Sequence, residues 1–436
     1  MDPEVYQLED KIPQIFPELF EECGESEYDF VNIDTKIKKS TRNWRKLDKV
    51  TRNDNTIEFI IKTDKEPFLL NTCLLITIPD IEVSKDYPGY QVAWCKNIAH
   101  NIARSIILDN GASKIISKLD TQLLDCIHNT ELLNSVEKVN SHSQYYESNN
   151  WLIGNRPELQ EPNTKLPKAK IGIIIPFLYS KYEGACPLHL MKNDLKHTVQ
   201  YCSDYSHLIR VIDDHNNILN RKKISSLINE GLIGKPKEIK FNMFARVGIM
   251  NPEDLEKSIN PELGNSSNDF YYIDHEVISD PNSITGKTIY VHNDIRRSFP
   301  VHRITWMAHN LTAENHNYTS NYCCESFSND GLGPSPCSGK VNLLYDDNKH
   351  RVAGIPSIIF SRIDPMITSP VITFESGFNT MTFVEQIGRR TASGLIFGKD
   401  LKTSIQIGMK WPEEYKCEFK MYLVFTVLKK LSFDKK

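Results

Sequence analysis

The chain has 436 residues, of which 40% are hydrophobic and 25% are charged, and its formal net charge at pH 7 is -4. This length suits two domains, and the composition is ordinary for a globular protein. The mildly acidic balance does not indicate a direct nucleic-acid partner, which normally requires a basic face. No segment reaches the roughly 18 to 20 apolar residues needed to span a membrane.

The chain begins with MDPEVYQLED, which has neither the basic nor the apolar region of a signal peptide. We therefore expect the protein to be made and kept in a cytosol-like compartment. The ten cysteines include no CxxC pair, and we expect reduced, mostly buried thiols. Cys323, Cys324 and Cys337 lie close in sequence, but a structural metal site would need four ligands, so neither a metal nor a cofactor is expected.

Residues 1–50 mix charged and aromatic residues without a clear period, and we interpret them as an N-terminal arm. The strand character begins after this arm, where Ile57, Phe59 and Ile61 alternate with mostly polar neighbours. Asn110-Gly111 predicts a hairpin turn, because this pair tolerates positive φ. Leucine and isoleucine at helical spacing predict a helix at 119–138.

The rest of the chain continues as short strands joined by long loops. Further strands are predicted at 68–78, 171–178, 197–212, 238–250, 371–374, 403–409 and 417–428, and short helices at 224–232 and from Asn251 onward. This pattern favours an all-β fold of two tandem antiparallel jelly-roll sandwiches, a double jelly-roll with a few short helices. We expect an arm at 1–50, a first jelly roll at 51–220 and a second at 221–436.

Several segments, taken in order, carry a family resemblance. VAWCKNIAH at 92–100 follows an apolar strand that ends in Pro79, and it leads into IILDNG at 106–111. IPFLYS at 175–180, CPLHL at 186–190 and HTV at 197–199 come next. Together they resemble the major capsid proteins of nucleocytoplasmic large DNA viruses, especially the iridovirus branch.

The second half adds looser matches to the same family. RITW at 303–306 resembles a family strand with tryptophan, and ASG at 392–394 followed by FGKD at 397–400 resembles a turn and strand near the family's C-terminus. The family's proline is Ala392 here, and its leucine before Pro-Leu is Cys186. The resemblance covers roughly residues 50 to 430.

This resemblance implies a structural coat protein rather than an enzyme: a homotrimer whose six similar blocks tile an icosahedral virion shell assembled in the host cytoplasm. Its partners would be other copies of the chain and minor capsid proteins, with an inner viral membrane as a further candidate. One alternative is a scaffolding protein of the same fold that leaves after virion assembly. Another is a β-sandwich enzyme or sugar-binding protein, which requires polar and aromatic residues to converge on one cleft.

Four motifs could carry chemistry, but each has a simpler interpretation, so no catalytic, cofactor or metal residue is assigned. His100 is placed on a strand with Trp94 and has no identifiable catalytic partner. GLIFGKD at 394–400 has too few residues between its glycines for a phosphate loop. Asp213-Asp214-His215 could bind a metal or act as acid and base, but fits a solvated turn. Glu413 and Glu414 are adjacent on a turn, unlike the opposed carboxylates of glycosidases.

Two other features have surface interpretations. Asn265, Asn310 and Asn317 begin glycosylation sequons, which we expect to be unmodified without a signal peptide. The pair Arg296-Arg297 is interpreted as a surface or subunit contact, with an anion site as the alternative.

Overall fold

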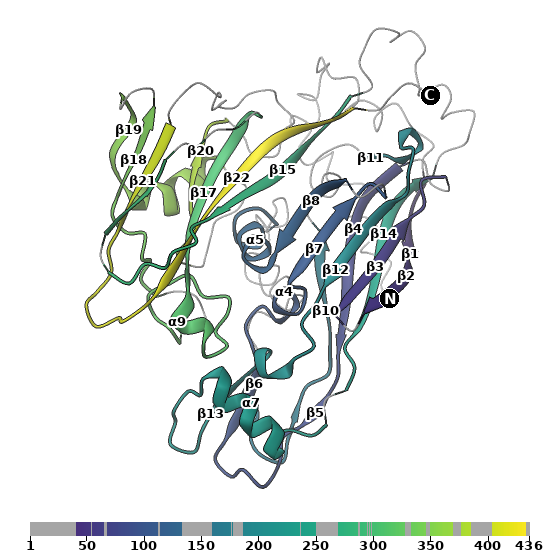
Figure 1. Ribbon diagram of the computed structural model, residues 1–436, viewed down its shortest axis with the longest axis vertical. Helices are drawn as coiled ribbons and strands as arrows, with labels where there is room; N and C mark the ends of the chain where they lie inside the picture. The colour runs from purple at the N-terminus through teal and green to yellow at the C-terminus, as the bar shows by residue number, and fades with distance from the viewer. Residues whose placement is uncertain are drawn as a thin grey trace, which may run out of the picture.

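The computed structural model describes residues 41–432, except for 54, 65–67, 112–113, 133–158, 176, 178–185, 236, 250–268, 287, 294, 296, 298, 328–332, 346–348, 369–375 and 385–402. Its antiparallel strands form two sandwiches that lie side by side (Figure 1). Each sandwich has its own hydrophobic core. Within the described residues, none of the helices is long and apolar enough to cross a membrane.

The first sandwich consists of two facing sheets. One sheet has the order β1 (Thr41–Lys46), β14 (Lys240–Ile249), β4 (Phe68–Ile78) and β10 (Ala169–Ile175), with β11 (Cys186–Pro187) also paired to β4. The other has the order β2 (Asp48–Asn53), β3 (Thr56–Ile61), β12 (Leu195–Gln200), β7 (Ser105–Asp109) and β8 (Ile115–Asp120). In β4, Leu74, Ile76 and Ile78 are buried while the residues between them are partly exposed, which is the period-2 pattern of a strand with one covered face.

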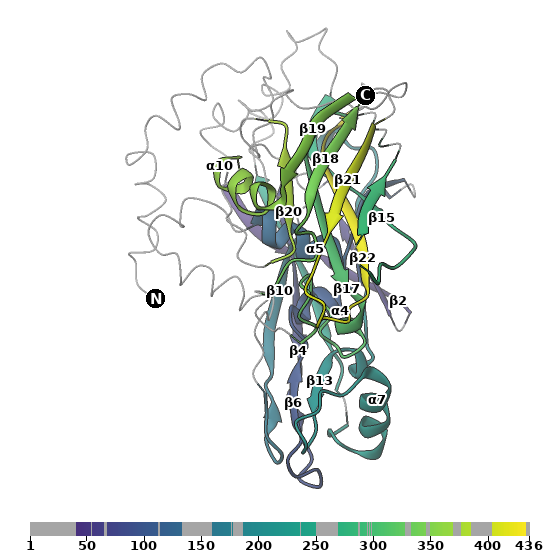
Figure 2. The same cartoon turned by 90° about the vertical axis from the view of Figure 1, so that its left-hand side faces the viewer.

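The second sandwich repeats this arrangement. One sheet has the order β15 (Asp269–Ser279), β22 (Phe419–Ser432), β17 (Val301–Asn310) and β20 (Asn379–Thr382). The other has the order β16 (Thr288–His292), β21 (Thr403–Met409), β18 (Lys340–Tyr345) and β19 (Lys349–Pro356). Figure 2 shows this sandwich from its outer side.

The helices lie in the connections between strands. They are α4 (Ile98–Ile102), α5 (Thr121–Ile127), α7 (Arg221–Glu230), α9 (Leu311–Glu314) and α10 (Asp364–Thr368), with π-helical turns η2 (His128–Leu132) and η6 (Ile359–Ile363) and 3-10 turns η3 (Leu188–Leu190) and η4 (Tyr205–His207). Helix α7, together with the strand pairs β6 (Gln91–Trp94) with β13 (Ile209–Ile212) and β5 (Ile81–Glu82) with β9 (Lys165–Leu166), forms a lobe at the lower end of Figure 1.

Both sandwiches have the same strand order. The eight principal strands of the first are β1, β3, β4, β7, β8, β10, β12 and β14, and those of the second are β15 to β22. Numbered along the chain, each set forms one sheet in the order 1-8-3-6 and a facing sheet in the order 2-7-4-5. Eight antiparallel strands in two such sheets are a jelly roll, so the chain contains two in tandem. The predicted fold class is confirmed.

The predicted boundary at 220 needs correction. Strand β14 pairs with β1 and β4 and is the eighth strand of the first jelly roll, which therefore extends to Ile249. A run of alternating residues does not reveal which sheet the strand joins. The polar turn before α7 resembles a linker between domains, but it lies within the first jelly roll. The predicted arm is also too long. Its last ten residues include β1 and the start of β2, and both strands belong to the first sandwich. Residues 1–40 lie outside the described part.

Most of the predicted elements that lie in described residues are present. The hairpin at Asn110 turns through Gly111, whose φ is 71°. The helix predicted at 119–138 begins two residues later, at Thr121, because β8 continues to Asp120 and the Asp120 side chain accepts a hydrogen bond from the Leu123 N–H. The predicted helix from Asn251 and the strand at 371–374 lie outside the described residues.

Candidate functional site

The junction between the two sandwiches contains two clusters of buried polar side chains. The sheet β15-β22-β17-β20 is covered on both faces, and all ten residues of β17 are buried. Along β22, Leu423 and Phe425 face the second core, whereas Tyr422 and Val424 join the core of the first sandwich. The first sandwich covers this outer face with α4, α5 and η2.

Glu131 at the end of η2 is the centre of a buried charge cluster. Its carboxylate forms an ion pair with Arg303 of β17, and both side chains are 1% exposed. The ring Nε2 of His275 on β15 lies 2.9 Å from the same carboxylate, and Thr426 of β22 donates to it at 3.3 Å. One acid of the first sandwich therefore contacts three strands of the second.

A second buried cluster surrounds Asp125 of α5. His100 Nδ1 lies 2.6 Å from one carboxylate oxygen, and Asn97 donates to the same oxygen at 2.8 Å. Tyr322 of the second sandwich donates to the other oxygen at 2.9 Å. Burial opposes ionisation, but the hydrogen bond and charge of His100, with hydrogen bonds from Ser320 and Asn97, outweigh it and hold the pKa of Asp125 below its ordinary value.

Further polar contacts extend the junction at both ends. At one end, Asp274 of β15 accepts a hydrogen bond from Ser117 at 2.7 Å and pairs with Lys429 at 2.9 Å. At the other end, the loop after α9 meets the lobe of the first sandwich. There the Asn317 amide donates to the carbonyls of Ser206 and Ile209, each at 2.6 Å. These contacts fix the relative orientation of the sandwiches, because buried polar groups tolerate little displacement.

His100 therefore has an acidic partner that sequence reasoning did not find. It lies in α4 rather than on the strand with Trp94 that was predicted, because that strand ends at Trp94. The exposed fractions of the His100 and Asp125 side chains are 2% and 0%. A substrate cannot reach side chains that are covered in this way. We therefore interpret the His100–Asp125 pair as a structural contact.

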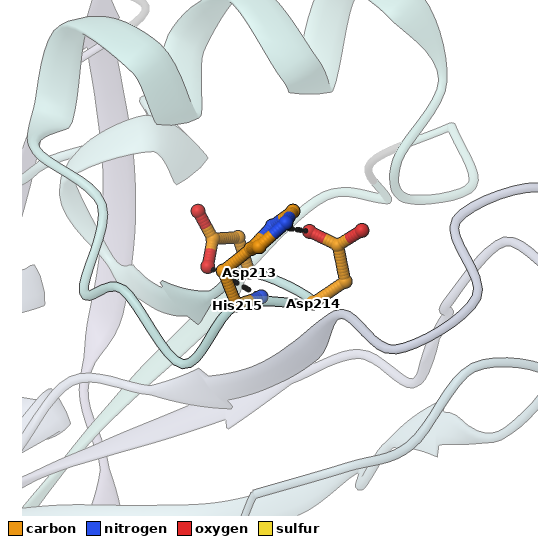
Figure 3. Close-up of side chains that lie close together, drawn as sticks. All are labelled: Asp213, Asp214 and His215. Carbon is orange, nitrogen blue, oxygen red and sulfur yellow. Dashed lines mark hydrogen bonds and ion pairs between the residues drawn. The ribbon is translucent and has the colours of Figure 1, made fainter.

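The Asp213-Asp214-His215 motif lies on the turn after β13 (Figure 3). Its possible ligand atoms lie within 4.8 Å of one another. Asp213, however, already accepts the backbone N–H groups of His215 and Asn217 at 2.9 and 2.7 Å. A carboxylate oxygen of Asp214 lies 2.8 Å from the ring Nδ1 of the exposed His215. These are the contacts of an Asx turn at the surface, and the motif remains assigned to a turn.

The other motifs have equally local roles. Glu413 borders an open pocket of about 590 Å³ with Trp411, Tyr415 and Glu418, whereas Glu414 does not line it. Arg297 pairs with Glu276 at 3.1 Å and stacks over the Phe425 ring at 4.1 Å. The motif at 394–400, Arg296 and Asn265 lie outside the described residues.

Two sequon asparagines have structural roles. Asn310 is fully buried, and its side chain caps α9 by accepting the Ala313 N–H at 2.9 Å. Asn317 is also fully buried and adopts a φ of 62°, a left-handed conformation that asparagine tolerates. Both side chains are inaccessible to a glycosylating enzyme in the folded chain. Of the nine cysteines in the described part, eight are buried thiols and Cys73 is partly exposed.

Sequence reasoning missed the junction residues. Asp125 and Glu131 lie within the predicted helix at 119–138, among leucines that mark its buried face. Arg303 lies in the segment RITW at 303–306, where the family resemblance rests on the tryptophan. A charged residue on an apolar face was the available signal, because such a residue needs a buried partner.

The sequence matches no protein-family model and no curated protein sequence. The structure resembles the Faustovirus major capsid protein with a TM-score of 0.66 and 8% identity, over 91% of each chain. The likeness to PBCV-1 VP54, whose crystal structure was fitted into a reconstruction of the virophage Sputnik, has a TM-score of 0.62 and 10% identity, over 90% of this chain and 95% of that one.

The crystal structure of the STIV MCP adds a third likeness, with a TM-score of 0.52 and 9% identity, over 89% of this chain and 96% of that one. The chain has the double jelly-roll fold of these proteins. The coverage shows that both jelly rolls take part in the match, and not one sandwich alone. The junction described above is therefore the contact between the two halves of a double jelly-roll.

Proposed function

We propose that this chain is a major capsid protein, which forms pseudo-hexameric homotrimers that tile an icosahedral virion shell. The observation that carries the proposal is the repeated strand order, 1-8-3-6 and 2-7-4-5, in two sandwiches fixed side by side. Three such chains in a closed ring present six similar blocks, which suits packing in a nearly hexagonal net. The capsid proteins that share the fold support the same assignment.

The role is structural rather than catalytic. The polar clusters at the junction are buried, and they hold two blocks at one orientation, as a building unit requires. We propose the virion capsid as its location, assembly in the host cytoplasm, and neighbouring trimers and minor capsid proteins as its partners. An inner viral membrane is a further candidate contact.

The experiment is a measurement of the mass of the purified protein by light scattering across a dilution series. The proposal predicts a particle of three chains, each of 50.2 kDa, that persists on dilution. A monomer at every concentration would contradict it. A trimer that is present in assembling particles and absent from mature virions would instead support the scaffolding alternative.

A further inference from the structure

The two jelly rolls carry equivalent helical segments. In the first, α5 and η2 follow the fifth principal strand, β8, and in the second, η6 and α10 follow the fifth principal strand, β19. Each segment combines an α-helical turn with a π-helical turn. The first segment docks on the outer face of the sheet β15-β22-β17-β20 through Glu131, and its Asp125 bonds to Tyr322 in the loop after α9.

The second segment has no such cover within the described chain. Ile358, Ile363, Met366 and Ile367, here called the helix patch, are 54%, 43%, 64% and 76% exposed. Between residues 357 and 368 these four are the exposed side chains, and none of them is charged. They account for four of the eleven large apolar side chains that the described residues leave exposed, and so dense a group indicates an interaction surface.

The helix patch is held rigidly. On the inner side, Phe360 is buried and its ring contacts Trp306 with centroids 5.3 Å apart. The Asp364 carboxylate accepts hydrogen bonds from Thr382 at 2.8 Å and Thr380 at 3.3 Å, both on β20. A partner that docks there therefore meets a preformed surface and need not order a loop.

The matching surface is the outer face of the equivalent sheet in the first jelly roll, β1-β14-β4-β10. Trp44 and Ile174 on this face are 52% and 41% exposed. Leu70, Leu75 and Phe244 are half-exposed. On the equivalent sheet of the second jelly roll, the corresponding side chains, such as Met307 and Val424, are buried because the first jelly roll covers them. We call Trp44, Ile174, Leu70, Leu75 and Phe244 the sheet face. Cationic side chains lie among them: the exposed Lys46 is opposite Phe244, and the partly exposed Arg246 is opposite Trp44.

We propose that the helix patch docks on the sheet face of a second copy of this chain. The proposal rests on the proposed trimer. In a closed ring each chain offers two different surfaces to its two neighbours. Inside the chain, the helical segment that follows the fifth strand of the first jelly roll packs on the 1-8-3-6 sheet of the second jelly roll. Between chains, the same contact would repeat, with the segment of the second jelly roll on the sheet of a neighbour's first jelly roll. The ring would contain six like contacts, three inside chains and three between them.

The two kinds of contact differ in chemistry. The contact inside the chain is rich in buried charge, whereas the helix patch is apolar and the sheet face offers tryptophan, leucine, isoleucine and phenylalanine beside Lys46 and Arg246. The apolar side chains gain free energy from desolvation, and the long stems of the two cations allow their charged ends to stay in water. A lipid surface is the competing occupant, and vesicle binding separates it from a second copy.

The test uses the full chain with a charge placed on either surface. Ile367→Asp in the helix patch and Ile174→Asp on the sheet face are each expected to raise the concentration at which trimers dissociate by about tenfold or more. The matched control is Ile289→Asp, because Ile289 on β16 is 62% exposed and lies on neither surface. Circular dichroism should show that all three variants remain folded.

A mixture of the two variants sharpens the test. The Ile174→Asp chain keeps an intact helix patch and the Ile367→Asp chain an intact sheet face, so the mixture is expected to form one-to-one dimers that cannot close a ring. Trimers that persist in either variant, with a trimeric wild-type chain, would overturn the docking while leaving the proposed function intact. A monomeric wild-type chain would overturn the proposed function itself. Flotation of trimers with anionic vesicles that Ile367→Asp abolishes, without loss of the trimer, would assign the patch to lipid.

Discussion

At the residue scale, Glu131 is the acid on which the charge cluster at the junction depends. Glu131→Gln would remove the carboxylate charge that forms the ion pair with the buried Arg303 guanidinium. We expect the free energy of unfolding to fall by about 3 kcal/mol or more. Urea unfolding followed by tryptophan fluorescence measures the change.

The control for this prediction is Glu230→Gln on α7, where the carboxylate is exposed and the expected change is below about 0.5 kcal/mol. The double variant Glu131→Leu with Arg303→Met should recover part of the lost stability, because both charges of the buried ion pair are removed together. Equal stability of Glu131→Gln and the wild type would show that the ion pair does not hold the junction.

His197 gives the first jelly roll a dependence on pH. Its ring is fully buried between the two sheets, 3.5 Å from the Thr72 hydroxyl. Burial lowers its pKa from 6.5 to about 3. The unfolded chain therefore binds a proton as the pH falls through 6.5, while the folded chain does not, and stability decreases from pH 6.5 toward pH 3. The loss is on the order of 5 kcal/mol over this window.

The variant His197→Gln, which stays neutral, should lose this part of the pH dependence. His215→Gln should keep it, because the His215 side chain is 79% exposed. Unfolding midpoints measured at several pH values between 3 and 7 compare the three proteins. An unchanged slope in His197→Gln would contradict the assignment. Asp125 acts in a lower window, since its depressed pKa makes its contribution disappear only below the ordinary value of 3.8.

At the scale of elements, the turn before β20 tests how closely the loops fit the junction. Gly377 has a φ of 98°, and a Cβ atom there would lie 2.1 Å from the Tyr322 carbonyl oxygen. Gly377→Ala should therefore destabilise the chain by about 3 kcal/mol or more and displace Tyr322 from Asp125. Thermal unfolding measures the effect.

Two other glycines separate the causes of this effect. Gly231 ends α7 with the same φ but has nothing within 4 Å of its Cβ position, so Gly231→Ala reports the backbone strain alone, about 1 kcal/mol. Gly286 is open and carries neither strain nor contact, and Gly286→Ala should be neutral. If Gly377→Ala lowers the free energy of unfolding no more than Gly231→Ala does, the close approach of Gly377 to Tyr322 does not contribute to stability.

The positions of the strands could be predicted from the sequence more reliably than the strands and side chains that they contact. The strands at 68–78 and 403–409 follow from apolar alternation or apolar runs, which depend on residues close in sequence. The assignment of β14 to the first sheet depends on β1 and β4, far away along the chain. The junction partners in the second sandwich lie far away along the chain: His275 and Thr426 are 144 and 295 residues from Glu131, and Tyr322 is 197 residues from Asp125. Such separations are beyond the reach of any local pattern.

At the scale of the whole molecule, the junction and the helix patch belong to one geometric scheme. The contact inside the chain sets the orientation of the second jelly roll relative to the first. If three chains close a ring, the same orientation must recur between chains, or the six blocks would not be evenly spaced. In the proposed trimer, the buried charges at the internal junction would set the shape of the ring, and the helix patch would contribute to its stability.

Electron microscopy of the negatively stained, purified protein tests the proposed role as a coat protein. We expect particles of three chains with a hexagonal outline, and ordered sheets or shells in which each particle has six neighbours. Single, elongated double sandwiches that never associate at high protein concentration would contradict this role.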